Sequence, residues 1–327
     1  MSTPVEAEHE VRRLARLAEE LGEIGLVLDG AAPWHPIAVA EIDYALRPRV
    51  HERRIPSYGA IIEPTTDPET WRRATTLGID LRAVWDRPTA AARPFADGVS
   101  SWLLRRVDGN DEWAVFDRPA GSERDLVIIA DAFGATVVQR HPSGTVRVIA
   151  ESGIYRWDGN RWLRQPLVAS WIETVGACAV RGERDVLQTL LEFAVHDLAA
   201  RSVGATLVYR PDESLEARFD RRFPPPPPLD IMRPSDLAPL RHVLAQVDGA
   251  ALFADDGTLT QIGVRLVPSD SAETGVDGFR GTRHTSGRRY SFDDPGATVV
   301  VVSEDGPVTV LRAGKILGAS APGPAAV

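Results

Sequence analysis

The sequence predicts an α/β protein of two domains. A mixed α/β domain is expected over residues 1–165, and a domain with a central mixed β-sheet flanked by helices over residues 166–318. The chain has 327 residues, enough for two domains of ordinary size. All eight tryptophans lie at or before Trp171, so the two parts have different core compositions. Residues 319–327 are rich in Ala, Pro and Gly and predict a disordered tail.

The N-terminal part combines helical and strand-like segments. Residues 5–21 alternate charged and apolar side chains at helical spacing and predict a helix that stops at Gly22. Asp67 and Pro68 suit the first positions of a short helix over residues 67–77. Two hairpins are expected at Ser143–Gly144 and at Asp158–Asn160. Four segments are predicted to be strands: 24–28, 58–62, 125–130 and 136–140, the last two as neighbours.

Charge and cysteine content limit the classes of function. A formal net charge of −9 and a pI near 5.4 argue against nucleic acid or a membrane surface as partners, since both require a basic field. The single cysteine, Cys178, excludes an internal disulfide framework and fits a reducing compartment. Neither a secretory signal nor an apolar run long enough to span a bilayer is visible. We therefore expect a cytoplasmic protein.

The C-terminal part begins with helices and continues with strands. A long amphipathic helix is predicted over residues 185–201, and we expect its His196 and Asp197 on a solvated face. The proline run Pro224–Pro228 predicts a stiff connector, with docking of a partner as the alternative. The other predicted segments are a bridging helix at 167–175, a polar break at 181–184, a helix at 234–246, strands at 203–209, 259–267 and 298–303, and turns at 255–257 and 304–306.

One stretch, Gly281–Ser291, concentrates glycine, hydroxyl groups, one histidine and three arginines between two strand-like segments. Backbone N–H groups at a turn or helix start can point at phosphate oxygens, and an arginine adds a bidentate fork. The stretch therefore suits a polyphosphate. The alternative is a solvated basic turn.

A second stretch, Asp248-Gly249-Ala250, lies about thirty residues upstream of the first. An Asp at a strand edge, followed by a Gly that lets a ligand approach the backbone, suits a metal–phosphate site. The tripeptide alone is weak evidence, because Asp29-Gly30-Ala31 repeats it. No Arg-His segment follows that first copy, which we interpret as a turn.

Together these stretches resemble the diadenylate cyclase (DAC) domain family. That family carries Asp-Gly-Ala, then Gly-Thr-Arg-His-Arg, a later Ser, and an apolar strand ending in Ser-Glu-Glu. This chain has Asp248-Gly249-Ala250, Gly281-Thr282-Arg283-His284, Ser291, and Val299–Ser303 followed by Glu304. The segment 203–208 is similar to the family's Gly-Ala-Leu segment, and the order holds over residues 183–318. Thr285 stands where the family has its second Arg, and Asp305 replaces the second Glu.

The resemblance implies a diadenylate cyclase that condenses two ATP molecules into cyclic di-AMP and two pyrophosphates. It further implies a homo-oligomer with cyclase domains face to face, Mg²⁺ or Mn²⁺ as cofactor, and regulation by an N-terminal sensor domain. The implied catalytic and metal-binding residues are Asp248, His284 and Glu304. The implied nucleotide-binding residues are Gly249, Ala250, Leu252, Gly281, Thr282, Arg283, Ser286 and Ser291, with Arg288 and Arg289 as substitutes for the missing Arg.

Two alternatives stay open at the level of sequence. Because Thr285 replaces an Arg, the domain could bind ATP or a cyclic dinucleotide without converting it, as a catalytically silent sensor. The tryptophans of the N-terminal part suit either an ordinary core or an aromatic ligand pocket.

Overall fold

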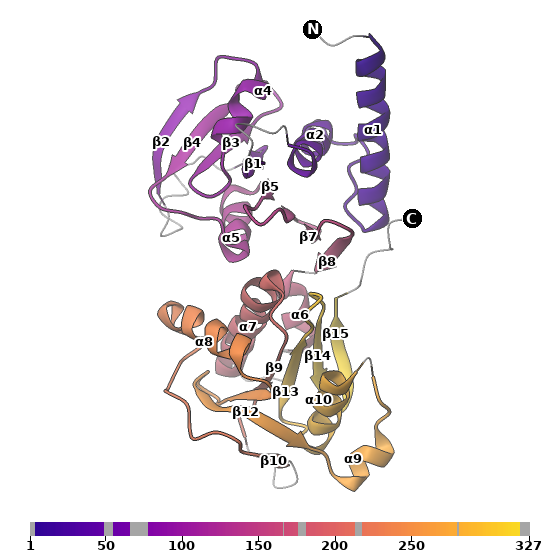
Figure 1. Ribbon diagram of the computed structural model, residues 1–327, viewed down its shortest axis with the longest axis vertical. Coiled ribbons are helices and arrows are strands. Elements are labelled where there is room, and N and C mark those ends of the chain that lie inside the picture. Colours follow the sequence, from indigo (N-terminus) through magenta and orange to yellow (C-terminus); the bar gives the residue numbers. More distant parts are fainter. Residues whose placement is uncertain are drawn as a thin grey trace. The chain divides into compact units, whose positions relative to one another are not determined.

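The computed structural model describes residues 4–48, 55–65, 78–165, 167–175, 181–212, 218–279 and 281–320. The chain divides into two compact units, one over residues 1–164 and one over residues 165–321. Each unit is a mixed β-sheet flanked by helices, as the sequence predicts (Figure 1). The predicted helix at 67–77 lies outside the described residues, as does the chain beyond residue 320.

The sheet of the N-terminal unit has the strand order β2-β4-β3-β1-β5-β6-β7-β8. Strand β1 is parallel to β3. The pairs β1–β5, β2–β4, β3–β4, β5–β6 and β6–β7 are antiparallel. The strands are β1 (Tyr58–Ile62), β2 (Ile79–Val84), β3 (Ser101–Arg105), β4 (Glu112–Phe116), β5 (Thr136–Arg140), β6 (Val146–Ala150), β7 (Gly153–Trp157) and β8 (Trp162–Gln165). The helices are α1 (Pro4–Glu23), α2 (His35–Leu46), α4 (Thr89–Ala92), the 3₁₀ turn η1 (Arg93–Phe95) and α5 (Glu123–Phe133).

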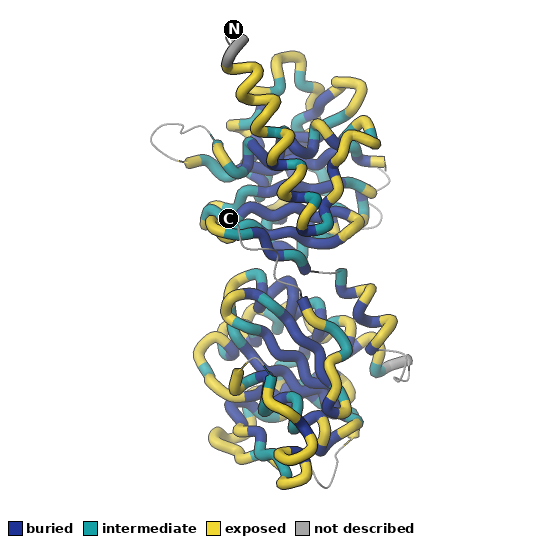
Figure 2. The backbone as a smooth tube through the Cα atoms, turned by 90° about the vertical axis from the view of Figure 1, so that its right-hand side faces the viewer, coloured by how far each residue is buried: buried dark blue, intermediate teal, exposed yellow. Residues whose placement is uncertain are grey.

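The N-terminal core lies on both faces of this sheet. Side chains of α1 and α2 form one cluster with Tyr58, Ala60 and Ile62 of β1. Helix α5 contacts β5 and β6, and its buried residues are absent from that cluster, so it covers the opposite face. Every residue of β1 is buried, as expected for a strand covered on both sides. In each unit the buried backbone runs through the interior and the exposed segments lie around it (Figure 2).

Two predicted strands of this unit are wrong. Residues 125–130 belong to helix α5, because Ser122 and Asp125 form a capping box and Gly134, at φ 57°, ends the helix in a left-handed conformation. Residues 24–28 form no strand. Ile24, Leu26 and Leu28 are buried, but the segment leaves α1 through a turn at Gly25 and packs on the core without a strand partner.

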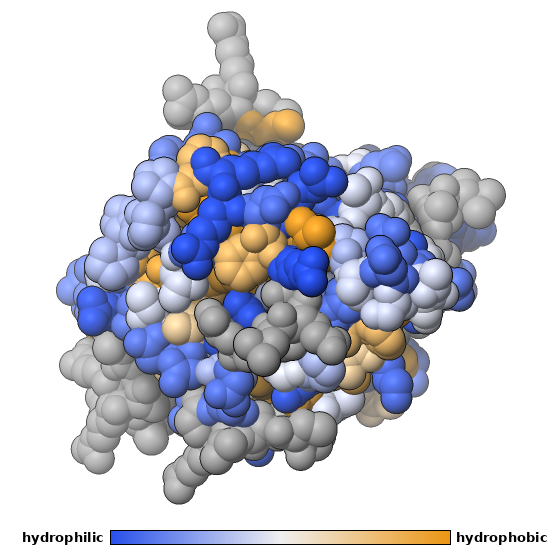
Figure 3. Space-filling view, turned by 90° about the horizontal axis from the view of Figure 1, so that it is seen from below, coloured by the Kyte–Doolittle hydropathy of each residue, from blue (hydrophilic) through white to orange (hydrophobic). Residues whose placement is uncertain are grey.

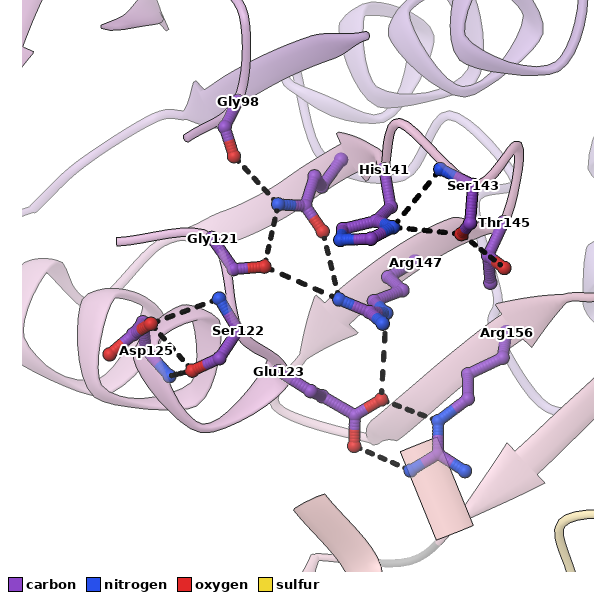
Figure 4. A network of polar contacts seen from close by, with 11 residues as sticks. Gly98, Gly121, Ser122, Glu123, Asp125, His141, Ser143, Thr145, Arg147 and Arg156 are labelled. Atoms are coloured by element: carbon purple, nitrogen blue, oxygen red, sulfur yellow. Dashed lines mark hydrogen bonds and ion pairs between the residues drawn. The ribbon is translucent and has the colours of Figure 1, made fainter. Parts of the chain in front are cut away.

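A buried polar network joins the start of α5 to the strands beside it (Figure 4). The Glu123 carboxylate accepts two hydrogen bonds of 2.5 Å from Arg156, and its side chain is completely buried. Arg147 lies 3.9 Å from the same carboxylate and donates to Oε1 of Gln139 at 3.2 Å. Gln139 in turn donates to the backbone carbonyl of Gly121 at 3.0 Å. Two strands and one helix are therefore joined by charged side chains that are almost completely buried.

The sheet of the C-terminal unit has the order β10-β12-β11-β9-β13-β14-β15. Strand β9 is parallel to β11 and antiparallel to β13. The strands are β9 (Ala205–Tyr209), β10 (Arg218–Asp220), β11 (Ala250–Phe253), β12 (Leu259–Val267), β13 (Thr298–Val302), β14 (Val308–Arg312) and β15 (Lys315–Ala319). The helices are α6 (Val168–Val175), α7 (Arg181–Glu192), the π-helical turn η3 (Phe193–Leu198), the 3₁₀ turn η4 (Ala199–Arg201), α8 (Pro234–Gln246), α9 (Asp270–Gly275) and α10 (Thr282–Asp293).

Helix α10 packs on one face of this sheet. Its Tyr290 shares a core cluster with Val299, Val301 and Leu311 of the central strands. Gly287 brings the helix close, since a Cβ atom there would lie 3.1 Å from Val299. Every residue of β13 is buried, and η3 also contacts this strand. The face of this unit seen from below is mostly hydrophilic, with small apolar areas between polar side chains (Figure 3).

Three predictions for the C-terminal unit need correction. Residues 181–184 do not break the chain but form the first turn of α7. His196 and Asp197 are buried rather than solvated, because the helix widens into the π-helical turn η3 and Asp197 lies 3.7 Å from Arg241 of α8. The tail does not begin at residue 319, since β15 includes Ala319 and Ser320 is buried.

Candidate nucleotide site

Two strand ends of the C-terminal sheet and the start of helix α10 bring the predicted acidic and basic residues together. Asp248 lies two residues before β11, and Glu304 lies two residues after β13. Strands β9 and β11 are parallel and β13 is antiparallel to β9, so the start of β11 and the end of β13 share one edge of the sheet. Helix α10 begins at the same edge, with Arg283 at its second position. Residues 56 positions apart in sequence, Asp248 and Glu304, thus become neighbours of one guanidinium.

Arg283 lies between the two carboxylates. Its Nη1 is 3.2 Å from Oε1 of Glu304, and its Nη2 is 3.5 Å from Oδ1 of Asp248. The side chains of Asp248 and Glu304 are 85% and 72% exposed, and that of Arg283 is 39% exposed. Water therefore reaches all three groups. The arrangement carries one net negative charge beside the positive end of a helix.

The first turn of α10 offers backbone donors to an anion. Gly281 precedes the helix with φ 147° and ψ 178°, a conformation that is essentially restricted to glycine, and no side chain caps the helix. The N–H groups of Thr282, Arg283 and His284 precede the first intrahelical donor, Thr285, which bonds to Gly281. A helix start with Arg beside it is a ready phosphate site. Gly281 and Thr282 are exposed at this end.

His284 turns away from the two carboxylates. It is buried, its Nε2 lies 3.3 Å from Oγ1 of Thr309 on β14, and its ring meets Phe279 edge to face. Within the described ranges, no group of three His, Cys, Asp or Glu side chains is arranged to hold a metal ion. The predicted trio of Asp248, His284 and Glu304 is therefore not assembled as a metal centre within one chain. Asp248 and Glu304 alone converge on one cation, Arg283.

The remaining hydroxyl and arginine residues of α10 contact the protein backbone. Arg288 donates to the carbonyl of Gly314 at 2.8 Å, and Arg289 donates to that of Val276 at 3.3 Å. Ser291 is buried, donates to the carbonyl of Arg288 and accepts from the N–H of Gly314. Ser286 donates to the carbonyl of Arg283. The bonds of Ser286 to Arg283 and of Ser291 to Arg288 lie within α10, whereas those to Gly314 and Val276 fix the helix to neighbouring segments. Arg288 and Arg289 therefore bond to backbone carbonyls and not to the carboxylates beside Arg283.

Thr285, at the position of the missing family Arg, has a local structural partner. Its hydroxyl accepts from the backbone N–H of Phe279 at 3.1 Å. The hydroxyl thus ties the segment before α10 to the helix.

Strand β11 places the backbone next to Asp248. Ala250 and Leu252 are buried in the core cluster that includes Tyr290 of α10, so only their backbone can face a ligand. Gly249 has φ 113°, and a Cβ atom there would lie 2.7 Å from the carbonyl carbon of Gly263. Glycine at this position is thus required by the approach of β12, independently of any ligand.

Gly204 is a site residue to which the sequence analysis assigns no role of its own. It directly precedes β9, and a Cβ atom on it would lie 2.4 Å from Nη1 of Arg283 and 2.7 Å from Cγ of Glu304. The absent side chain leaves the space in which the Arg283–Glu304 pair lies. The only sequence signal was its position at the start of a strand-like Gly-Ala segment.

These features define a mixed α/β domain with a candidate phosphate site at one edge of its sheet, preceded by a second mixed α/β domain. Comparison with known families gives the particular classes. Residues 192–316 match the family model described as "DisA bacterial checkpoint controller nucleotide-binding" (DAC), and residues 15–165 match the model described as "Probable sensor domain DACNK". The first half of the chain is therefore similar to DACNK domains, and the second half is similar to DAC domains.

Other comparisons add little. No curated protein matches the chain. Among solved structures, a hypothetical membrane spanning protein from Bacillus cereus is 24% identical, with a TM-score of 0.33 over 41% of this chain. The match covers 66% of that protein's chain, slightly under two thirds, and a score this low carries no argument about structure. In the described part of the present chain, no helix is long and apolar enough to cross a membrane.

Proposed function

We propose that this protein is a diadenylate cyclase, which condenses two ATP molecules into cyclic di-AMP and two pyrophosphates. The observation that carries the proposal is the convergence of Asp248, Arg283 and Glu304 at the start of α10, within the domain that matches the DAC family. Each domain would hold one ATP, with the triphosphate at the N–H groups of Thr282, Arg283 and His284. Catalysis then requires two domains facing each other across a two-fold axis.

The exposed carboxylates of Asp248 and Glu304 suit the part of the site where the ribose hydroxyl attacks the α-phosphate. Asp248 would accept a hydrogen bond from the ribose 3′-hydroxyl of the nucleotide held by the partner domain and so orient it toward the α-phosphate. Arg283 would place its positive charge where negative charge develops on the phosphate oxygens. Asp248 and Glu304 are also the oxygen ligands that Mg²⁺ or Mn²⁺ prefers, and their convergence on one cation fits such an ion. When bound, the ion would neutralise phosphate charge and lower the pKa of the attacking hydroxyl.

The direct test is product identification. Purified protein is incubated with ATP and Mn²⁺, and the product is identified by mass spectrometry. Asp248→Asn keeps the size of the side chain but removes its charge, and we expect it to lower turnover by at least about a hundredfold, the usual worth of a positioned acid–base group. Asp220→Asn, at an exposed position on β10, is the matched control. Near-normal turnover in folded Asp248→Asn would exclude the assigned role.

A second candidate function is binding without turnover, in which the domain senses ATP or a cyclic dinucleotide. Thr285 favours it, because the position of the family's second Arg is here committed to the contact with Phe279. Two measurements decide between the functions: ATP binding by calorimetry and product formation with Mg²⁺ or Mn²⁺ over a range of protein concentrations. Protein that binds ATP but forms no product under any of these conditions would favour this second function.

A further inference from the structure

Arg283 lies between the two carboxylates that the proposed function assigns to a metal ion. Its guanidinium contacts one oxygen of Asp248 and one of Glu304, so the two carboxylates are already bound to a cation that belongs to the protein. A divalent ion placed between the same oxygens would meet the positive charge of Arg283 within a few ångströms. Because like charges repel, the guanidinium of Arg283 would weaken the binding of such an ion to the two carboxylates.

The space for this arrangement is built into the fold. Gly204 lies beside the pair, and any side chain there would meet both Arg283 and Glu304. The φ of Gly204 is not in the left-handed region, so its backbone does not demand glycine. Space for the side chains is the remaining reason for glycine at this position.

We propose that Arg283 is an exchangeable cation which keeps divalent metal away from Asp248 and Glu304 until a polyphosphate draws it off. The nucleotide and the metal ion would then enter together, and the ion would not bind ahead of the nucleotide. Gly204 is the positioning residue that allows Arg283 to reach Glu304. This inference rests on the proposed function, because it assumes that a nucleotide binds at the start of α10.

The geometry suits exchange rather than permanent pairing. Both contacts are longer than 3 Å, and both carboxylates are mostly exposed. Exposed ion pairs of this kind are weak. A triphosphate offers Arg283 more negative charge and bidentate geometry, and the N–H groups of the same helix turn attract the same oxygens. Moving Arg283 from carboxylates to phosphate leaves Asp248 and Glu304 available at the moment when the ligand brings its metal ion.

The test measures Mn²⁺ binding to the full chain without nucleotide, from the amplitude of the electron paramagnetic resonance signal of free Mn²⁺. Arg283→Met removes the charge and keeps the length, and we expect it to tighten Mn²⁺ binding about three- to tenfold, the combined worth of two exposed pairs. Arg283→Lys keeps the charge and should stay within about twofold of the unaltered protein. Arg233→Met removes an exposed arginine that pairs with Asp230 on the same unit, and should change nothing.

The outcomes separate this inference from the proposed function. Unchanged Mn²⁺ affinity in Arg283→Met, with circular dichroism showing the native fold, overturns the inference even if the protein makes cyclic di-AMP. Tighter Mn²⁺ binding in Arg283→Met but not in Arg283→Lys supports the inference even if no product forms, in which case only the proposed reaction fails. Equal tightening in both variants would also overturn it, because the charge would then not be the cause.

Discussion

The buried ion pair between Glu123 and Arg156 should contribute strongly to the stability of the N-terminal unit. Glu123→Gln keeps the volume of the side chain but removes its negative charge from beside Arg156 and Arg147, which are both buried. Removing one partner of a buried pair costs about 3–5 kcal/mol. Since Gln still offers one acceptor oxygen, we expect the lower end, about 3 kcal/mol. For a unit of this size that corresponds to a melting temperature lower by about 6–12 °C.

Tryptophan fluorescence makes this prediction measurable in the full chain. Seven of the eight tryptophans lie in the N-terminal unit and only Trp171 lies in the other, so urea unfolding followed by fluorescence reports mainly on the N-terminal unit. Glu8→Gln breaks an exposed pair with Arg12 and serves as control, with an expected change below about 0.5 kcal/mol. A loss of less than about 1 kcal/mol in Glu123→Gln would refute the reasoning, because the carboxylate would then not be needed to hold the two arginines.

Three further predictions concern the C-terminal unit. Gly249→Ala should destabilise it by at least about 1–3 kcal/mol from backbone strain alone, measured by calorimetry; a stable variant would contradict the close approach to Gly263. Arg288→Ala combined with Arg289→Ala should lower stability by about 1–2 kcal/mol and leave ATP affinity unchanged, because both side chains donate to backbone carbonyls; weaker ATP binding would restore their predicted role at the phosphates. Burial, followed by the charges of Glu183 and Asp255, raises the pKa of Tyr209 to about 12. The unfolded chain loses this proton near pH 10, so the contribution of Tyr209 to stability is complete below about pH 10 and is lost as the pH rises toward about 12. Tyr209→Phe should remove that part of the alkaline decline, and an identical decline in both proteins would show that other groups cause it.

The motifs in the sequence, through the family that they resemble, were enough to predict a C-terminal domain with a mixed sheet flanked by helices. They also singled out Asp248, Arg283 and Glu304, but they did not predict that Arg283 lies between the two carboxylates. Long apolar runs such as residues 298–302 identify strands buried on both faces, and the turns beside them place acidic residues at strand ends. The direction of a side chain on a helix was not predictable in the same way. Arg288 and Arg289 follow Arg283 closely in sequence, but which carbonyls they meet depends on how α9 and β15 pack against α10.

The errors share a physical cause, which is that local pattern competes with tertiary packing. Residues 125–130 are apolar enough for a strand, but the capping box at Ser122 starts a helix there. The Ser and Asp three residues apart are visible in the sequence, so this helix could have been predicted. The burial of His196 and Asp197 could not be predicted from the sequence. A π-helical turn shifts every following side chain relative to the ordinary helical period, so the face expected in solvent turns inward.

The first and last described residues of the C-terminal unit are held next to each other. Gln165 donates to the carbonyl of Gly306 at 2.8 Å and accepts from the hydroxyl of Ser320. The two ends of this unit therefore lie side by side. A domain with neighbouring ends can be expressed alone or inserted into a loop of another protein with little disturbance to either fold. Trp171 of α6 also packs on Gly318 of β15, so a fragment beginning at Gly182 would expose that strand, whereas one beginning at Gln165 keeps the module closed.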